Sequence, residues 1–548
     1  MVSKFPILLR ITSPLLRLFD EFNEMEQSPA PMQLTNFAWI ALSCVAIASH
    51  AQTPAPISTQ APDPNTRVLS LDEALRLSVE HNLDVKIQRL DPEIARYQLQ
   101  ASYGFYDPHL NFVINHEETT QEGKFVGGLQ SVPSVQKIDS FGILIASGPK
   151  LDEVDPKFIV GNLPTGLKYA LDANINHRTG TRGASALDQY DGDVGIILRQ
   201  PLLRDAWIDA PRAAIAMNKN NLTISEFALE LKIMQVILNT QQAYYDLVAA
   251  TDNVKVRQNA LELAGRAVND ARKRVQAGTM LPLTEKSAES ASASAKADLL
   301  SAQRQRDFRE NVLKSMITDD YERWHVLSIA PSEKLLAIPQ TYNLQASWVE
   351  GLMRRPDFKQ IRAEVERQGI QVSLRNNQLF PTLDLTGAAG RTSVDSTFTG
   401  SLGDVSSNRN PTWAVGVIVS IPFTFMENRN NYKAARSRMK QMELELQKAH
   451  QNVIISIEDA VKAAQSAYEG IMAQREARVF AETALDAALK RFQNDRVTSY
   501  EVLQVERDLT AARSLEIQAL ADYNKALAQL YFNEGTILKR AGLELKTK

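Results

Sequence analysis

Few residues in this 548-residue chain have the types and spacing that catalysis or metal binding requires. His116-Glu117-Glu118 begins like the helix of a zinc protease, but Thr120 stands where the second histidine ligand would be needed. The single cysteine, Cys44, lies inside a predicted export signal, so the mature chain would hold no disulfide and no thiolate metal site. We therefore predict no enzymatic activity, no catalytic residue, no cofactor and no metal site.

Charged and polar side chains gather at two predicted turns, over 277–284 and 494–499, each of which joins a long helix to a shorter one. The candidates are Thr284 and Glu285 at the first turn and Asp495, Arg496, Glu501 and Gln504 at the second. If several copies of the chain surround one opening, a carboxylate such as Glu501 forms an acidic ring that favours cations. Arg496 could hold the turns shut by charge pairing. The alternative interpretation is that these residues are solvated charges at helix ends.

The elements that position these turns belong to a tandem duplication. Residues 194–196 and Pro201 match residues 415–417 and Pro422 at a constant offset of 221 (415 − 194 and 422 − 201). The first repeat is predicted over 69–320 and the second over 344–537, joined by a linker at 321–343. The repeat therefore favours one protomer with two similar halves over several unrelated domains.

Each repeat contains one very long helix, predicted at 211–277 and at 432–493. At about 1.5 Å per residue these helices span roughly 100 Å and roughly 93 Å, too long for an ordinary globular domain. Two shorter helices accompany each long one, so that two short helices stacked end to end match its length. In the first repeat, the apolar period predicts that one of these shorter helices runs over 71–103. The last helix carries a second apolar stripe, at Ile517, Leu520 and Leu527, which suits neighbours on both sides. The alternative, a simple bundle or dimeric coiled coil, predicts one stripe.

Prolines mark the passages between helices and strands. Pro108 and Pro381, related by an offset of 273 (381 − 108), each end a helix and precede a stretch of alternating polarity. The predicted strands lie near 109–119, 191–201, 382–393 and 412–422. The long connection before the second strand holds strand-like pieces at 141–145 and 167–176, which we interpret as extended strand ends, an extra hairpin or a surface loop.

A protomer with about four membrane strands cannot close a barrel alone, because the smallest closed membrane barrels use eight strands. Two protomers would give 8 strands and three would give 12. Closure therefore requires oligomerisation, with cyclic symmetry making coaxial tubes of the strands and the helices.

The ends of the chain are predicted to lie outside this framework. Residues 1–51 read as an extension and signal peptide, with the apolar core at 37–48 and the true start at Met1 or Met32. Residues 52–68 read as a flexible tether and 538–548 as a C-terminal tail. A net charge of −3 gives no electrostatic case for nucleic acid.

These residues resemble the TolC-like outer-membrane efflux protein family over about Leu69 to Gly535. The resemblance rests on motifs that occur in the same order in both repeats: 71–75 with Asn82, the exits at Pro108 and Pro381, 200–203, 274–278, and 491–493 with 500–503. It implies a mainly α protein with membrane β, a homotrimer whose 12-stranded outer-membrane barrel continues into a 12-helix periplasmic barrel. It also implies outer-membrane lipid, a periplasmic adaptor and an inner-membrane transporter as partners, in a Gram-negative-type bacterium.

For the turns, the resemblance implies a periplasmic aperture. Family members often carry Asp where Glu501 stands, with another carboxylate at the position of Gln504. Thr284 occupies the equivalent first-repeat position, and Asp495 replaces a usual glycine. The expected function is export, as multidrug or metal efflux or type I protein secretion. The alternative is a periplasmic coiled-coil adaptor with no channel of its own.

Overall fold

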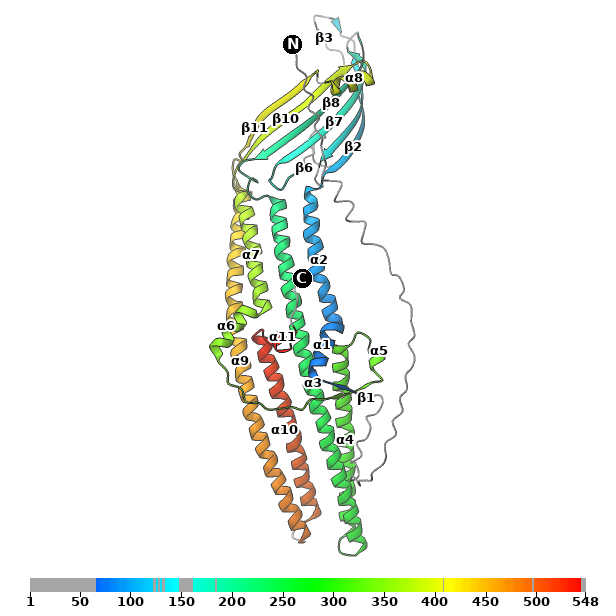
Figure 1. Ribbon diagram of the computed structural model, residues 1–548, viewed down its shortest axis with the longest axis vertical. Coiled ribbons are helices and arrows are strands. Elements are labelled where there is room, and N and C mark those ends of the chain that lie inside the picture. The colour runs from blue at the N-terminus through cyan, green and yellow to red at the C-terminus, as the bar shows by residue number, and fades with distance from the viewer. Residues whose placement is uncertain are drawn as a thin grey trace, which may run out of the picture. The chain divides into compact units, whose positions relative to one another are not determined.

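The computed structural model describes residues 66–121, 125–126, 129–130, 134–146, 161–182, 185–407, 409–494 and 497–543. The predicted export signal, both candidate starts and most of the predicted tether lie outside the described residues. All described residues belong to one structural unit, in which a large sheet adjoins one end of a set of long helices (Figure 1).

The sheet is antiparallel throughout, and its strands follow the order β11-β10-β8-β7-β5-β2, with short β6 beside β7. The strands are β2 (His109–Gln121), β5 (Ser134–Ala146), β6 (Gly161–Asn162), β7 (Lys168–Arg182), β8 (Ser185–Pro201), β10 (Thr382–Asp395) and β11 (Pro411–Ser420). A small hairpin of β3 (Phe125–Val126) and β4 (Leu129–Gln130) stands between β2 and β5.

The described part of the sheet has six long strands where the sequence predicted about four. Of the three interpretations offered for the long connection, the extra hairpin is correct, because β5 and β7 pair along their lengths between β2 and β8. The four prolines lie where expected, next to helix–strand passages: Pro108 and Pro381 precede β2 and β10, Pro201 ends β8, and Pro422 follows β11.

Apart from two boundaries and three short helices that the sequence did not predict, the helices follow the predicted repeat. They are α1 (Leu71–His81), α2 (Leu83–Tyr103), α3 (Ala210–Gln276), α4 (Pro282–Ile317), α5 (Tyr321–Trp324), α6 (Leu344–Arg354), α7 (Pro356–Asn377), α8 (Phe398–Ser406), α9 (Met426–Gln493), α10 (Ser499–Asn533) and α11 (Ile537–Arg540), with a 3-10 turn, η2 (Gly104–Tyr106), after α2.

The first boundary that differs breaks the helix predicted over 71–103. The Asn82 side chain accepts hydrogen bonds from the backbone of Asp84 and Val85, so it caps a new helix instead of continuing the old one. The second is the start of α9, six residues before the predicted 432. The first turns of α9 hold three asparagines, whose low helix propensity concealed the start.

Four helices lie side by side at each level of the molecule. Next to the sheet, α2 contacts α3, α3 contacts α7, and α7 contacts α9; further away, α4 contacts α3, α3 contacts α10, and α10 contacts α9. The long α3 and α9 run through both levels, and the shorter helices occupy one level each (Figure 1). This is the arrangement that stacking two short helices against one long helix predicts.

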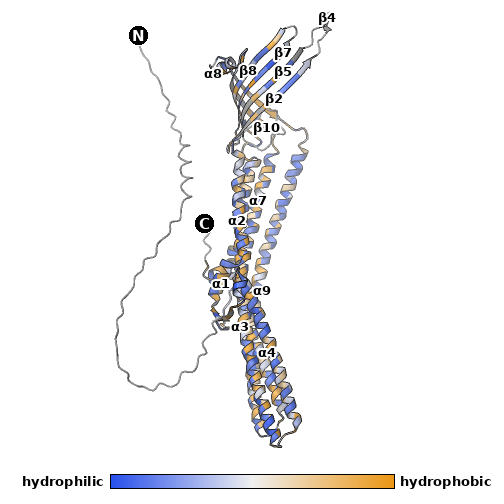
Figure 2. Ribbon diagram, turned by 90° about the vertical axis from the view of Figure 1, so that its right-hand side faces the viewer, coloured by the Kyte–Doolittle hydropathy of each residue, from blue (hydrophilic) through white to orange (hydrophobic). Residues whose placement is uncertain are grey.

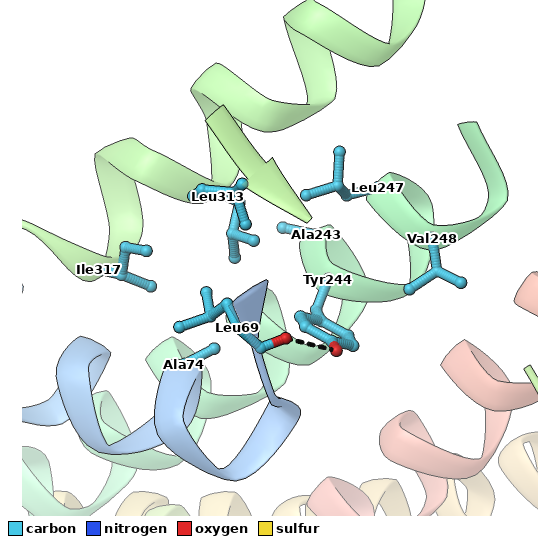
Figure 3. Close-up of a cluster of buried hydrophobic side chains, with 9 residues drawn as sticks. Leu69, Ala74, Ala243, Tyr244, Leu247, Val248, Leu313 and Ile317 are labelled. Atoms are coloured by element: carbon cyan, nitrogen blue, oxygen red, sulfur yellow. Dashed lines mark hydrogen bonds between the residues drawn. The ribbon is translucent and has the colours of Figure 1, made fainter. Parts of the chain in front are cut away.

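Between the two levels, the start of the described chain is bound to the link between the repeats. β1 (Thr66–Leu69) pairs in parallel with β9 (Ser328–Pro331). Leu69 is fully buried, and its carbonyl oxygen accepts a 3.0 Å hydrogen bond from the Tyr244 hydroxyl on α3 (Figure 3). Burying such side chains contributes roughly 1.5–3 kcal/mol each, which anchors both segments to the long helix.

Three segments predicted as tether, linker and tail are therefore partly ordered. The tether at 52–68 ends by Thr66, where β1 begins, and the linker at 321–343 contains α5 and β9. In the tail, Leu538 and Leu543 pack against a cluster that includes buried Ile537 and residues of α3. Short apolar segments without a clear period give little warning that they will be buried against a distant helix.

Candidate functional site

One face of the sheet exposes a continuous apolar band. Residues that pair directly across neighbouring strands point to the same face. By this register, exposed apolar side chains share one face of all six long strands: Phe112 and Ile114 on β2, Phe141 on β5, Leu171 on β7, Val194, Ile196 and Leu198 on β8, Leu385 on β10, and Trp413, Val415, Val417 and Val419 on β11. Apolar and polar residues interleave along the strands in Figure 2. A band of this size suits lipid or a partner, not water.

The opposite face of the sheet is more polar and carries cross-strand ion pairs. The Arg199 Nε atom on β8 donates a 2.9 Å hydrogen bond to Asp384 Oδ2 on β10, and Asp384 is only 4% exposed. Arg178 on β7 lies 2.5 Å from Asp191 on β8. A sheet with one apolar and one polar face is the arrangement of a membrane barrel around an aqueous lumen.

The two edge strands of the described sheet have no strand partner on their outer sides. β2 stands at one end of the strand order and β11 at the other, with five antiparallel steps between them, so the two edges run in opposite directions. Long free edges pair readily with another chain. The same sheet thus supplies the face that a membrane would cover and the edges that another copy would complete.

At the other end of the molecule, the predicted site residues have different surroundings. Glu285, in the first turn of α4, accepts a 3.0 Å hydrogen bond from Arg272 Nε on α3. The Nη2 atom of the same arginine donates a 3.5 Å hydrogen bond to Glu289. Neighbouring Thr284 is partly buried. We call α3 and α4 with their turn the first helical hairpin, and α9 and α10 with theirs the second. In the first helical hairpin, Glu285 is therefore engaged in an ion pair with Arg272 of the same hairpin.

The second turn holds the residues with exposed side chains. Glu501, in the first turn of α10, is exposed, and its backbone N–H donates a 3.4 Å hydrogen bond to the hydroxyl of Thr498. Gln504 is exposed one turn further along. Asp495 and Arg496 lie outside the described residues. The structure thus brings Glu501 and Gln504 together on one hairpin and leaves the expected pairing of Arg496 as a prediction.

A carboxyl group that the sequence reasoning missed lies between the two hairpins. Glu506 on α10 lines a hollow with Arg257 of α3 and Asp298 of α4, and it also borders a second hollow with Phe492 of α9. Burial raises the pKa of Glu506, and the charge of Arg507 opposes this only in part. A signal was present, because the second apolar stripe of α10 passes through Glu506 when it is continued toward the turn.

Three contacts join the first helical hairpin to the second, two of them farther from the turns than this hollow and one close to the turns. Lys525 on α10 lies 2.9 Å from Asp246 on α3. The Ser514 hydroxyl on α10 donates a 2.8 Å hydrogen bond to the Asn253 side chain on α3. Near the turns, the Arg274 guanidinium lies 4.7 Å from the centre of the Phe492 ring. These three contacts are polar or cation–π in character, unlike the buried apolar clusters that hold the helices together elsewhere.

Within the second hairpin, a glutamate breaks the apolar pattern. Glu516 interrupts the apolar series Leu509, Ala512, Ala519 and Tyr523 of α10, whose spacing predicts an apolar residue at position 516. Its carboxylate contacts Arg478 at 2.5 Å and Arg475 at 3.2 Å, both on α9. Arg513 on α10 returns a 2.9 Å contact to Glu482. This ion-pair network holds α9 to α10, while the contacts between hairpins are fewer.

Among the described residues, no group of three or more His, Cys, Asp or Glu side chains is placed to hold a metal ion. None of the described helices has both the length and the apolar composition needed to cross a membrane.

Comparison with known proteins gives a consistent result. The family model described as outer membrane efflux protein matches residues 172–318 and 349–536. The cation efflux system protein CusC of Escherichia coli K12 is 23% identical over 312 residues, which are 57% of this chain and 65% of CusC, just under two thirds of its length. The outer membrane efflux protein BepC of Brucella suis is 22% identical over 350 residues, 62% of this chain and 72% of BepC.

Solved structures share the fold. The CmeC outer membrane channel of Campylobacter jejuni superposes with a TM-score of 0.60 at 16% identity, covering 87% of this chain and 90% of CmeC. The MtrE outer membrane channel of Neisseria gonorrhoeae gives 0.58 at 17% identity, covering 86% and 90%.

Proposed function

This chain belongs to the outer membrane efflux protein family, and from that premise we propose that it forms a channel in the outer membrane of a Gram-negative bacterium. Its sheet spans the membrane, and its long helices extend into the periplasm. Substrates delivered by an inner-membrane transporter leave the cell through it. The observation that carries this proposal is the sheet with a lipid-compatible face, a polar face and two free edges.

The channel is a homotrimer. Three copies bring twelve helices to each level, because four helices lie side by side in one copy. Three copies also close the sheet into a barrel, which one copy cannot do with two free edges. A periplasmic adaptor joins the helical end to the transporter. The adaptor alternative for this chain is not favoured, because an adaptor has no use for a broad apolar band on a sheet.

The aperture lies at the tips of the two hairpins. Three copies of Glu501 form an acidic ring that favours cations, and Gln504 adds polar groups one turn away. Thr284 and Glu285 occupy the corresponding place in the first repeat. The aperture opens when the second hairpin moves away from the first, at the cost of the contacts of Lys525 and Ser514. Cargo is selected by the transporter, so drugs, metal ions and secreted proteins all remain candidate substrates.

The test is single-channel conductance of the purified protein in a planar bilayer, with native mass measured on the same preparation. A trimer that gives small, cation-selective steps supports both the channel and its nearly closed resting state. A monomer or dimer that gives no conductance at any voltage would sink the proposal and return the adaptor interpretation.

A further inference from the structure

We propose that the β5–β7 hairpin is part of the membrane wall, so that each copy contributes six strands and the trimer closes an 18-stranded barrel. Closure pairs the free edge of β2 in one copy with the free edge of β11 in the next. This inference rests on the proposed channel function. It departs from the twelve strands that the family resemblance implies, which would need four strands from each copy.

The first argument is that the apolar band continues across the hairpin. Phe141 on β5 pairs with Ile114 on β2 and with Ile175 on β7, so the three lie in one row on the apolar face. Phe141 is 49% exposed, in line with its neighbours in the band. β5 has 13 residues and β7 has 15, more than the 9–11 or so that a tilted membrane strand needs. A loop outside the membrane has no reason to keep this register and composition.

The second argument is that the inner turn of the hairpin is built into the body of the protein. This turn follows β6 and lies on the helix side of the sheet. Gly166 has a φ of +83°, and a Cβ atom there would come within 2.9 Å of the Arg212 guanidinium in the first turn of α3. β6 also contacts η2, at the end of α2. The connection of the hairpin therefore contacts the end of α2, which leads into β2, and the start of α3, which follows β8. These are the two strands between which the hairpin is inserted.

The third argument is one of width. Next to the sheet each copy presents four helices, which at about 9 Å apart occupy about 36 Å of a circumference. Six strands about 4.8 Å apart and tilted by about 40° occupy about 38 Å, whereas four would occupy about 25 Å. Six strands thus match the arc of the helices to which they connect.

Closure between copies is also consistent with strand direction. β2 runs away from the helices and β11 runs toward them, so the edge of one copy meets the next as an antiparallel neighbour. Three copies of six strands give 18, and barrel diameter grows roughly in proportion to strand number. The outer-membrane pore is therefore about one and a half times as wide as that of a 12-stranded barrel.

The test is thiol labelling in intact outer membranes, in full-length protein whose only cysteine, Cys44, is changed to Ala. Ser140→Cys and Asn174→Cys report on the polar face of the hairpin, and Phe141→Cys and Ile175→Cys report on the apolar face. Matched controls on β8 are Ile197→Cys for the polar face and Ile196→Cys for the apolar face. A membrane-impermeant maleimide and a lipid-soluble maleimide are compared at each position.

We expect the impermeant reagent to label Ser140→Cys and Asn174→Cys at least tenfold faster than their two apolar-face neighbours, which only the lipid-soluble reagent reaches. If all four hairpin positions react equally fast with the impermeant reagent while Ile196→Cys stays protected, the hairpin is outside the membrane and this inference fails alone. If Ile196→Cys is also labelled from water, the proposed channel fails with it.

Closure is tested by oxidising pairs of cysteines on the two edges. Phe112→Cys on β2 is combined in turn with Trp413→Cys, Val415→Cys and Val417→Cys on β11, since these positions sample successive registers on the apolar face. A ladder of dimers and trimers on a denaturing gel is expected for at least one pair and for none of the single variants. Absence of cross-links from all three pairs in a preparation that is trimeric by native mass would overturn the β2–β11 pairing.

Discussion

The Lys525 ammonium on α10 lies 2.9 Å from the Asp246 carboxylate on α3, and this ion pair joins the two helical hairpins. Arg309 on α4 contacts the same carboxylate at 3.0 Å. Burial by itself would lower the pKa of Lys525, but hydrogen bonds to Asp522 and Asp246 outweigh it and the pKa is raised overall. The lysine therefore stays charged at neutral pH, so the ion pair does not depend on pH in that range.

Lys525→Met is expected to loosen the second hairpin. The Asp246 carboxylate, 19% exposed, keeps Arg309 but loses its link to α10. We expect a loss of about 1–2 kcal/mol of stability, between the values for exposed and buried pairs, together with a higher resting conductance. A double-mutant cycle with Asp246→Asn, followed by thermal unfolding and bilayer recording, measures both.

The control for this change is Lys462→Met, which removes an exposed lysine paired with Glu458 on its own helix. It should leave both the resting conductance and the melting temperature unchanged, because an exposed pair of this kind contributes little. If Lys525→Met behaves like this control, the ion pair does not restrain the hairpin.

Glu506 predicts a pH dependence of the resting state. Its pKa is raised by burial, so the folded assembly favours the protonated form more than the unfolded chain does. The stability that this gives is fully present below the unfolded-state pKa of about 4.3 and is lost as the pH rises through the folded-state pKa. The hairpins should therefore pack more tightly near pH 4.5 than near pH 7.5.

Replacing Glu506 by Gln should abolish that dependence. At pH 7.5 the variant should melt higher and conduct less at rest than the original protein, and at pH 4.5 the two should agree. The other charged groups that line the two hollows are unchanged: Arg257, Asp298, Arg507, Arg266, Asp270 and Arg274. Glu469→Gln, at an exposed position of α9, is the control and should retain the original pH profile. A persisting difference at pH 4.5 would count against titration of Glu506.

Glu501 predicts the ion preference of the aperture. Because its side chain is exposed and three copies would converge in the trimer, Glu501→Gln should lower the cation-to-anion permeability ratio by roughly twofold or more. Reversal potentials in a salt gradient measure the ratio. The charge-matched control is again Glu469→Gln. Unchanged cation preference and unchanged resting conductance in Glu501→Gln would remove this residue from the aperture.

The large elements could be predicted from the sequence because each has a strong periodic signal and occurs twice. The constant offset between Pro201 and Pro422 located both long helices and the strands before them. The break at Asn82 was missed because the apolar period continues across it, while a single side-chain cap ends one helix and starts another. Local hydrogen bonding decided this boundary, and the hydrophobic pattern carried no trace of it.

The exposed residues of the candidate site, next to the turns, could be predicted from the sequence. The ion pairs between side chains on different helices could not. The sequence identified Glu501 and Gln504 from their place after the turn. It could not assign Glu285 to Arg272, because that contact depends on how the two helices face each other. The β5–β7 hairpin has no counterpart in the second repeat, so the duplication could not reveal it.

The contact between β8 and β10 predicts which glycines the sheet requires. Gly390 on β10 pairs with Gly195 on β8, and a Cβ atom on Gly390 would lie 2.6 Å from the Val194 carbonyl oxygen. A backbone atom cannot move aside without displacing its strand. Gly390→Ala should therefore destabilise the assembly by about 1–3 kcal/mol, the usual cost of overpacking.

Gly387→Ala, three residues away on the same strand, is the matched control, because an added Cβ atom there meets nothing within 4 Å. Its effect should stay within about 0.5 kcal/mol. Heating the folded protein and following the loss of the proposed trimer on a gel compares the two variants directly. Equal melting temperatures of the two variants would mean that β8 and β10 do not approach as closely at Gly390 as their register requires. The sheet would then lack the close β8–β10 contact at its centre.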